Sequence, residues 1–113
     1  MDYSVEKSND NYITVLAEGR LDAFTGRQLW DELDGLCNQG YRNFIADLSE
    51  TTFMDSAGLA VLVRLLKRTK NIDGTTVLVW PKQETASRIL RLTRFDRIFT
   101  IQDSVEDAIQ SLK

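Results

Sequence analysis

Apolar and polar positions alternate along the chain with two different periods, which predicts a series of strands and helices. Residues 3–7 alternate in polarity, turn-forming residues occupy 8–11, and residues 12–17 have high strand propensity. This pattern predicts an antiparallel hairpin at the start of the chain. Short apolar runs typical of buried strands follow at residues 43–48, 75–80 and 98–101.

Between these strands, apolar residues recur at helical spacing and predict four amphipathic helices. Gly40 is expected to end the first helix, and the second is expected to run from near Ser56 to about Lys70. The third is expected over residues 83–93, and Ser104 is expected to cap the fourth. The predicted inward faces are formed by Leu29, Leu33, Leu36 and Cys37; by Leu59, Leu62, Val63 and Leu66; by Ala86, Ile89, Leu90 and Thr93; and by Val105, Ala108, Ile109 and Leu112.

The predicted order of elements is therefore β-β-α-β-α-β-α-β-α. Such alternation is typical of an α/β domain whose mixed sheet is parallel except at the hairpin, with the helices packed on the sheet. No linker or internal repeat divides the chain, so we expect one domain over residues 1–113. Because sites in such sheets form where strands lead into helices, residues 19–24 and 49–58 are the candidate site loops.

Composition mainly excludes classes of function. The 113-residue chain has no histidine and a single cysteine, Cys37, so imidazole catalysis and multi-thiolate metal sites are not expected. A net charge of −3 disfavours general nucleic-acid binding, which relies on a basic surface. Residues 1–7 lack a signal-peptide pattern, and the apolar run at 57–63 is too short to span a bilayer. We therefore expect a soluble, cytoplasmic protein that uses no cofactor or metal and does not bind a membrane.

The strongest candidate site lies in the loop over residues 48–59. Either Asp55 or Ser56 can serve as the N-cap of the second helix, because both side chains accept hydrogen bonds from free backbone N–H groups. Gly58 in the first turn costs about 1 kcal/mol relative to alanine, which is understandable if another backbone or a ligand approaches closely. Two interpretations stay open at this point. The loop is a simple helix cap, or Ser56 is a regulated hydroxyl whose phosphate would lie near the positive end of the helix dipole.

A family resemblance bears on this choice. The segment Gly19-Arg20-Leu21-Asp22, followed by Phe53-Met54-Asp55-Ser56-Ala57-Gly58-Leu59, resembles the signature of the STAS domain. It is similar above all to the stand-alone anti-sigma factor antagonists of bacteria, and the resemblance covers nearly the whole chain. The resemblance implies a non-enzymatic module that an anti-sigma factor, itself a serine kinase, phosphorylates. The unphosphorylated antagonist binds this kinase and releases its sigma factor, and a metal-dependent serine phosphatase resets the cycle.

The same resemblance assigns residues. Ser56 matches the phosphoacceptor, and Asp22 and Asp55 match the acidic positions near it. Gly58 and Leu59 match the start of the partner-binding helix, so the implied partner-binding set is Asp22, Asp55, Ser56, Gly58 and Leu59. Many members carry a second serine where this chain has Ala57, which leaves one acceptor in the motif. The alternative within the family is a STAS scaffold in another signalling or transport assembly, without sigma-factor regulation.

For the tryptophans, Asp47 and a group of arginines, a purely structural role competes with a functional one. Trp30 and Trp80 are expected to pack against the core, with a contact surface as the alternative. Asp47 could be the acceptor of a phosphoaspartate receiver, another small α/β switch, but the opening hairpin differs from that fold, and hydrogen bonding within the loop is the favoured role. Four arginines form either a solvated face or a surface for an acidic partner: Arg88, Arg91, Arg94 and Arg97.

Overall fold

The computed structural model describes residues 2–8 and 12–112. Strands β1 (Asp2–Lys7) and β2 (Tyr12–Leu21) pair antiparallel, with Tyr3 opposite Ala17, which confirms the predicted hairpin. Residues 9–11 of the predicted turn lie outside the described residues. Alternate residues of β2 are buried, as expected for a strand with one face on the core: Ile13, Val15 and Ala17.

The other strands are β3 (Asn43–Asp47), β4 (Thr51–Met54), β5 (Thr75–Val79) and β6 (Thr100–Gln102). Strands β3, β5 and β6 join the hairpin in one sheet, in the order β1-β2-β3-β5-β6. Every neighbouring pair in this order is parallel except β1 with β2. Strand β4 lies off this path and pairs in parallel with the end of β2. The predicted mixed α/β sheet is confirmed.

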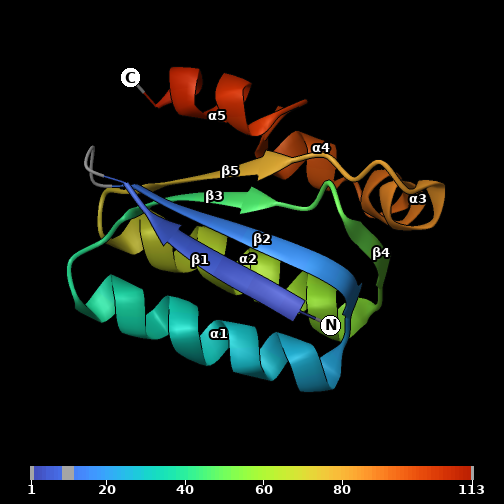
Figure 1. Cartoon of the computed structure of the whole chain (residues 1–113), viewed down its shortest axis with the longest axis horizontal. Helices are drawn as coiled ribbons and strands as arrows, with labels where there is room; N and C mark the ends of the chain where they lie inside the picture. The colour runs from blue at the N-terminus through green and yellow to red at the C-terminus, as the bar shows by residue number, and fades with distance from the viewer. Residues whose placement is uncertain (1, 9–11, 113) are drawn as a thin grey trace.

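Five helices accompany the sheet in the described part of the chain: α1 (Ala23–Asn38), α2 (Ser56–Asn71), α3 (Glu84–Leu92), α4 (Phe95–Ile98) and α5 (Val105–Ser111). Helices α1 and α2 lie side by side on one face of the sheet, and α5 covers the opposite face (Figure 1). Ser104 caps α5 as predicted, since its side chain accepts from the backbone N–H of Asp107. None of the helices within residues 2–8 and 12–112 is long and apolar enough to cross a membrane.

The predicted inward face of α1 is fully buried, and Cys37 packs there as an apolar group. The predicted face of α2 is partly wrong. Leu59 and Leu62 are buried, but Val63 and Leu66 are only partly covered. Val61 and Leu65 are buried in their place, because α2 packs on α1 as well as on the sheet and its buried stripe is therefore wider than one face. In α3, Thr93 is exposed because the helix ends at Leu92.

Two short elements differ from the sequence prediction. The last strand begins at Thr100 instead of Ile98, because residues 95–98 form α4. Phe95 and Phe99 are buried with stacked rings 5.5 Å apart, and their spacing of four residues favours one helical turn. Strand β4 was not predicted at all. It has only four residues, of which Thr51 and Met54 are buried, so it lacks the alternation that identifies a strand.

Candidate functional site

Two helices begin next to each other where β2 and β4 end. Leu21 and Met54 are register partners at the last position of the two strands, and Asp22 and Asp55 follow them directly. The backbone N–H of Asp55 also donates to the carbonyl of Leu21, at 3.4 Å. The structure thus brings the two candidate loops together at the carboxyl ends of β2 and β4.

Gly19 explains how β2 reaches this position. Its φ of 81° lies in the left-handed region that favours glycine. The register of β2 against β4 shifts between Gly19 and Arg20, which is the point where the strand has left β3. The glycine of the Gly-Arg-Leu-Asp segment therefore redirects β2 and carries Asp22 beside Asp55.

Asp55, not Ser56, is the N-cap of α2. Its Oδ1 accepts from the backbone N–H groups of Ala57 and Gly58, each at 3.0 Å. Ser56 is the first residue of the helix, and its side chain is exposed. Among the described residues no hydrogen bond involves the Ser56 hydroxyl. The structure therefore assigns the cap to Asp55 and leaves the Ser56 hydroxyl exposed and outside the cap.

Asp22 is the N-cap of α1 and forms a capping box with Thr25. Its Oδ1 accepts from the backbone N–H groups of Phe24 and Thr25, both at 3.1 Å, while its own N–H donates to Thr25 Oγ1 at 3.0 Å. The pKa of Asp22 is lowered mainly by the two hydrogen bonds from Thr25, which outweigh the opposing effect of desolvation. The backbone N–H of Phe24 and the charge of Arg20 lower the pKa by smaller amounts.

This lowered pKa makes folding stability depend on pH. A carboxyl group whose pKa is lower in the folded protein stabilises it above the unfolded value of 3.8 and loses that contribution as pH falls through the folded pKa. Asp22→Asn keeps a capping side chain but removes the charge. We expect urea unfolding to show wild type more stable than Asp22→Asn at about pH 6 and the gap to narrow at about pH 3. Asp103→Asn is the control, and a gap for Asp22→Asn that does not change with pH would contradict the prediction.

Gly58 and Leu59 lie inside the protein and not on its surface. A Cβ on Gly58 would lie 2.2 Å from the carbonyl oxygen of Leu21, which confirms the close approach of another backbone that the sequence suggested. Leu59 is only 9% exposed and belongs to the core cluster. The expectation that these two residues belong to a partner-binding set stays a prediction, and their burial favours an indirect role. They set the position of Ser56 from within, because the first turn of α2 packs directly on the end of β2.

Some exposed residues around the site were missed. Phe24 follows the Asp22 cap and is 74% exposed, although it is a large apolar side chain. Arg20 lies over the ring of Phe53, with Cζ 4.2 Å from the ring centroid. Phe24 could have been singled out because it lies off the buried face of α1 marked by Leu29.

Asp47 has the role in its loop that the sequence favoured. It is 9% exposed, and its Oδ1 accepts from the backbone N–H of Ser49 at 3.0 Å. It lines a small cavity of about 200 Å³ at the ends of β3 and β5, which Ser56 does not line. The hydrogen bond explains why an aspartate ends this buried strand.

Fold and site together define a small α/β domain that presents a serine on the first turn of a helix. Residues 3–108 match the model of the STAS domain family. The chain belongs to this family, which confirms the resemblance noted in its sequence. The anti-sigma-B factor antagonist of Bacillus subtilis is 31% identical over 105 residues, which cover 93% of this chain and 89% of that protein.

Solved structures agree with this assignment. A Thermotoga maritima protein proposed to be an anti-sigma factor antagonist superimposes with a TM-score of 0.87 and 26% identity, covering 96% of this chain and 92% of its own. The anti-sigma factor antagonist SpoIIAA in its unphosphorylated form gives a TM-score of 0.81 at 19% identity, with 98% and 97% of the chains covered. Its phosphorylated form, from Bacillus, gives 0.79 at 18% identity and covers 99% and 100%. At these identities the two SpoIIAA structures show the shared fold.

Proposed function

We propose that this protein is an anti-sigma factor antagonist whose binding to its partner is switched by phosphorylation of Ser56. The observation that carries the proposal is the division of roles at the start of α2, where Asp55 caps the helix and leaves the exposed Ser56 hydroxyl without a structural task. The similarity to the anti-sigma-B factor antagonist of Bacillus subtilis supports the class of partner.

The position of Ser56 suits a modification that changes the surface and spares the fold. A phosphate there adds about −1.5 to −2 charges at pH 7. The helix N-terminus favours negative charge, because the first backbone N–H groups and the helix dipole point toward it. SpoIIAA has the same fold as this chain in both its unphosphorylated and its phosphorylated form, which supports a switch without refolding.

The same phosphate opposes association. Asp22 and Asp55 already place two carboxylates at the adjoining helix starts. A third negative group would have to lose its water of hydration in the interface, and it would repel acidic groups of the partner or a nucleotide bound there. Unmodified Ser56 is small and neutral and allows close contact. The modification therefore acts by preventing binding.

The proposed partners follow from this role. The binding partner is an anti-sigma factor that is itself a serine kinase, which binds the unmodified protein and releases its sigma factor. A metal-dependent serine phosphatase would regenerate the hydroxyl. In this proposal Asp22, Asp55 and Ser56 contact the kinase directly. Gly58 and Leu59 are buried and act through the position of α2. This exchange would take place in the cytoplasm.

The test joins capture with labelling. Immobilised wild-type protein and its Ser56-phosphorylated form are exposed to cell extract, and we expect the unmodified form alone to retain the anti-sigma factor kinase. The purified kinase with ATP should then label wild type but not Ser56→Ala. Since Asp55 is the cap, Ser56→Ala should keep its free energy of unfolding within about 0.5 kcal/mol of wild type. If the kinase labels Ser56→Ala as fully as wild type, Ser56 is not the phosphorylation site. If the immobilised protein retains only components of another assembly and no anti-sigma factor, the role of a STAS scaffold is favoured.

A further inference from the structure

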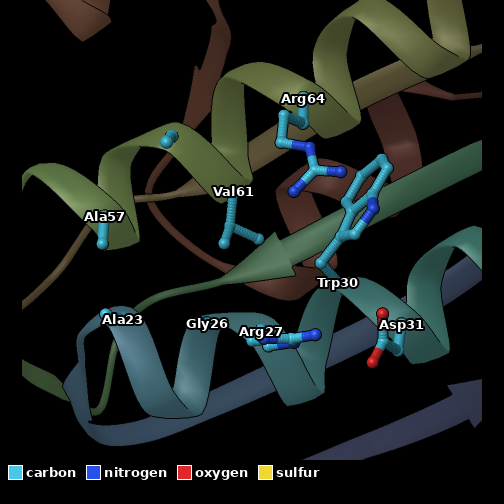
Figure 2. Close-up of a pocket in the computed structure, with 9 residues that line it drawn as sticks. Ala23, Gly26, Arg27, Trp30, Asp31, Ala57, Val61 and Arg64 are labelled. Atoms are coloured by element: carbon cyan, nitrogen blue, oxygen red, sulfur yellow. The ribbon is translucent and has the colours of Figure 1, made fainter.

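A groove runs between α1 and α2, beginning beside the first turns of both helices. Its volume is about 530 Å³, within the range of sites that accept ligands. Figure 2 shows its side chains coming from both helices. The residues that line it are Ala23, Gly26, Arg27, Trp30, Asp31, Ala57, Ala60, Val61 and Arg64. Ala57 directly follows Ser56, so the α1–α2 groove is continuous with the proposed switch site.

The groove is positively charged on a protein that is negatively charged overall. Helix α2 carries Arg64, Lys67, Arg68 and Lys70 and has no acidic residue, whereas the whole chain has a net charge of −3. Arg68 is paired with Asp34. By contrast, neither Arg27 nor Arg64 forms an ion pair within residues 2–8 and 12–112. Two cations against the single carboxylate of Asp31 give the groove a net positive charge.

The position of the Arg64 side chain leaves its guanidinium N–H groups able to bind a carboxylate. Its Cζ lies 4.4 Å from the ring centroid of Trp30, so the guanidinium stacks on the indole across the groove (Figure 2). Stacking uses the face of the guanidinium and leaves the N–H donors at its edge, where carboxylates bind in a bidentate manner. Arginine and tryptophan are also the residue types that most often dominate binding energy at interfaces.

Most of the other residues that line the groove are small, so a partner segment can approach the two helices closely. Ala23, Ala57 and Ala60 offer only methyl groups, and Gly26 offers none. The two helices already touch at Gly26, where an added Cβ would lie 3.0 Å from Val61 Cγ2. A segment lying on these small residues can bring its side chains to Arg27 and Arg64 without displacing a large one.

We infer that the α1–α2 groove binds an acidic segment of the anti-sigma factor kinase, with carboxylates on Arg64 and Arg27 and apolar contact on Trp30. This inference rests on the proposed function for the identity of the partner. It adds a second attachment point next to Ser56, formed by residues that are not themselves modified. The groove provides affinity for an acidic partner, and Ser56 decides whether that partner can come close.

The first test uses the isolated protein and hexaglutamate as the probe. In spectra of ¹⁵N-labelled protein, we expect hexaglutamate to shift the amides of residues 23–31 and 57–64 and the indole N–H of Trp30. The indole of Trp80, which donates to Ser87 on α3, is the internal control. Hexalysine should leave these signals in place. The absence of shifts, or shifts centred on the arginines of α3 and α4, would overturn the groove as the site.

The second test compares two charge reversals of equal size. Arg27→Glu/Arg64→Glu should abolish the hexaglutamate shifts and weaken binding of the kinase by about 100-fold, since like charges then face each other. Arg88→Glu/Arg97→Glu changes the net charge equally on α3 and α4 and should change affinity by less than about threefold. Equal loss in both variants would mean general attraction and would overturn the inference.

The outcomes separate the two proposals. If Ser56→Asp abolishes kinase binding while Arg27→Glu/Arg64→Glu leaves it unchanged, the switch stands and the groove inference falls. If hexaglutamate binds the groove but no anti-sigma factor kinase binds the protein, the proposed function falls and the acidic segment belongs to no such partner.

Discussion

Phosphorylation of Ser56, or the substitution Ser56→Asp, is expected to weaken binding of the anti-sigma factor kinase by about 100-fold, because unfavourable charge contacts in an interface cost several kcal/mol and each 1.4 kcal/mol is a factor of ten. Ser56 is exposed at the start of α2, directly after Asp55, and Asp22 caps the adjoining helix α1. Titration calorimetry with the purified kinase measures the effect directly. The phosphoprotein should bind at least as weakly as Ser56→Asp, because phosphate carries more charge.

The matched control is Ser104→Asp. Ser104 also stands at a helix start, where it caps α5, and aspartate caps as well as serine. The control therefore adds one negative charge on the opposite face of the sheet and should leave kinase affinity unchanged (Figure 1). Unfolding curves of both variants should match wild type within about 0.5 kcal/mol. Equal weakening by Ser104→Asp would show that net charge, and not the site of Ser56, governs association.

Replacing Gly58 by alanine is expected to lower the free energy of unfolding by about 3 kcal/mol, a large share of the stability of a small domain. The added Cβ would lie 2.2 Å from the carbonyl oxygen of Leu21 and 3.0 Å from its Cγ. Because the oxygen belongs to the backbone of β2, no side-chain rotation relieves the overlap. Urea unfolding followed by circular dichroism gives the change.

Gly35→Ala is the control for helix propensity. Gly35 lies in α1, and its added Cβ would meet no atom within 4 Å. Alanine there should raise the free energy of unfolding by about 0.5–1 kcal/mol, as expected for glycine in a helix interior. If Gly58→Ala were also stabilising, the packing of α2 on β2 would be looser than the structure indicates.

The elements predicted best from sequence are those with long, simple periodicity. The face of α1 is one leucine stripe on a helix with one main partner, so the pattern and the burial coincide. Helix α2 contacts both the sheet and α1, and the period alone cannot tell which flank of its apolar face is better covered. Elements of four residues, β4 and α4, have no period of their own and depend on tertiary contacts such as the Phe95–Phe99 stack.

In the candidate site, too, features with local causes can be predicted from sequence, whereas features that depend on tertiary packing cannot. A loop with Asp55, Ser56 and Gly58 is recognisable from local chemistry, because caps and glycines have local causes. Which of two neighbouring residues caps depends on φ and ψ, and the structure assigns it to Asp55. The α1–α2 groove joins Trp30 to Arg64, residues 34 positions apart whose stacking follows only from the packing of the two helices. The sequence therefore indicates the candidate serine and its loop but not the neighbouring α1–α2 groove.

The pairing of Arg68 with Asp34 has a further consequence for recognition. Arg68 Nε lies 3.3 Å from Asp34 Oδ1, and Nη2 donates to Asn38 Oδ1 at 2.8 Å, so the far ends of α1 and α2 are joined by side chains. The near ends are joined through Gly26 and Val61 and through the adjoining caps. Two helices joined at both ends form a preorganised groove, so a partner that enters it would lose little affinity to rearrangement of α1 and α2. Selectivity at this surface would then depend mainly on the shape and charge of the partner.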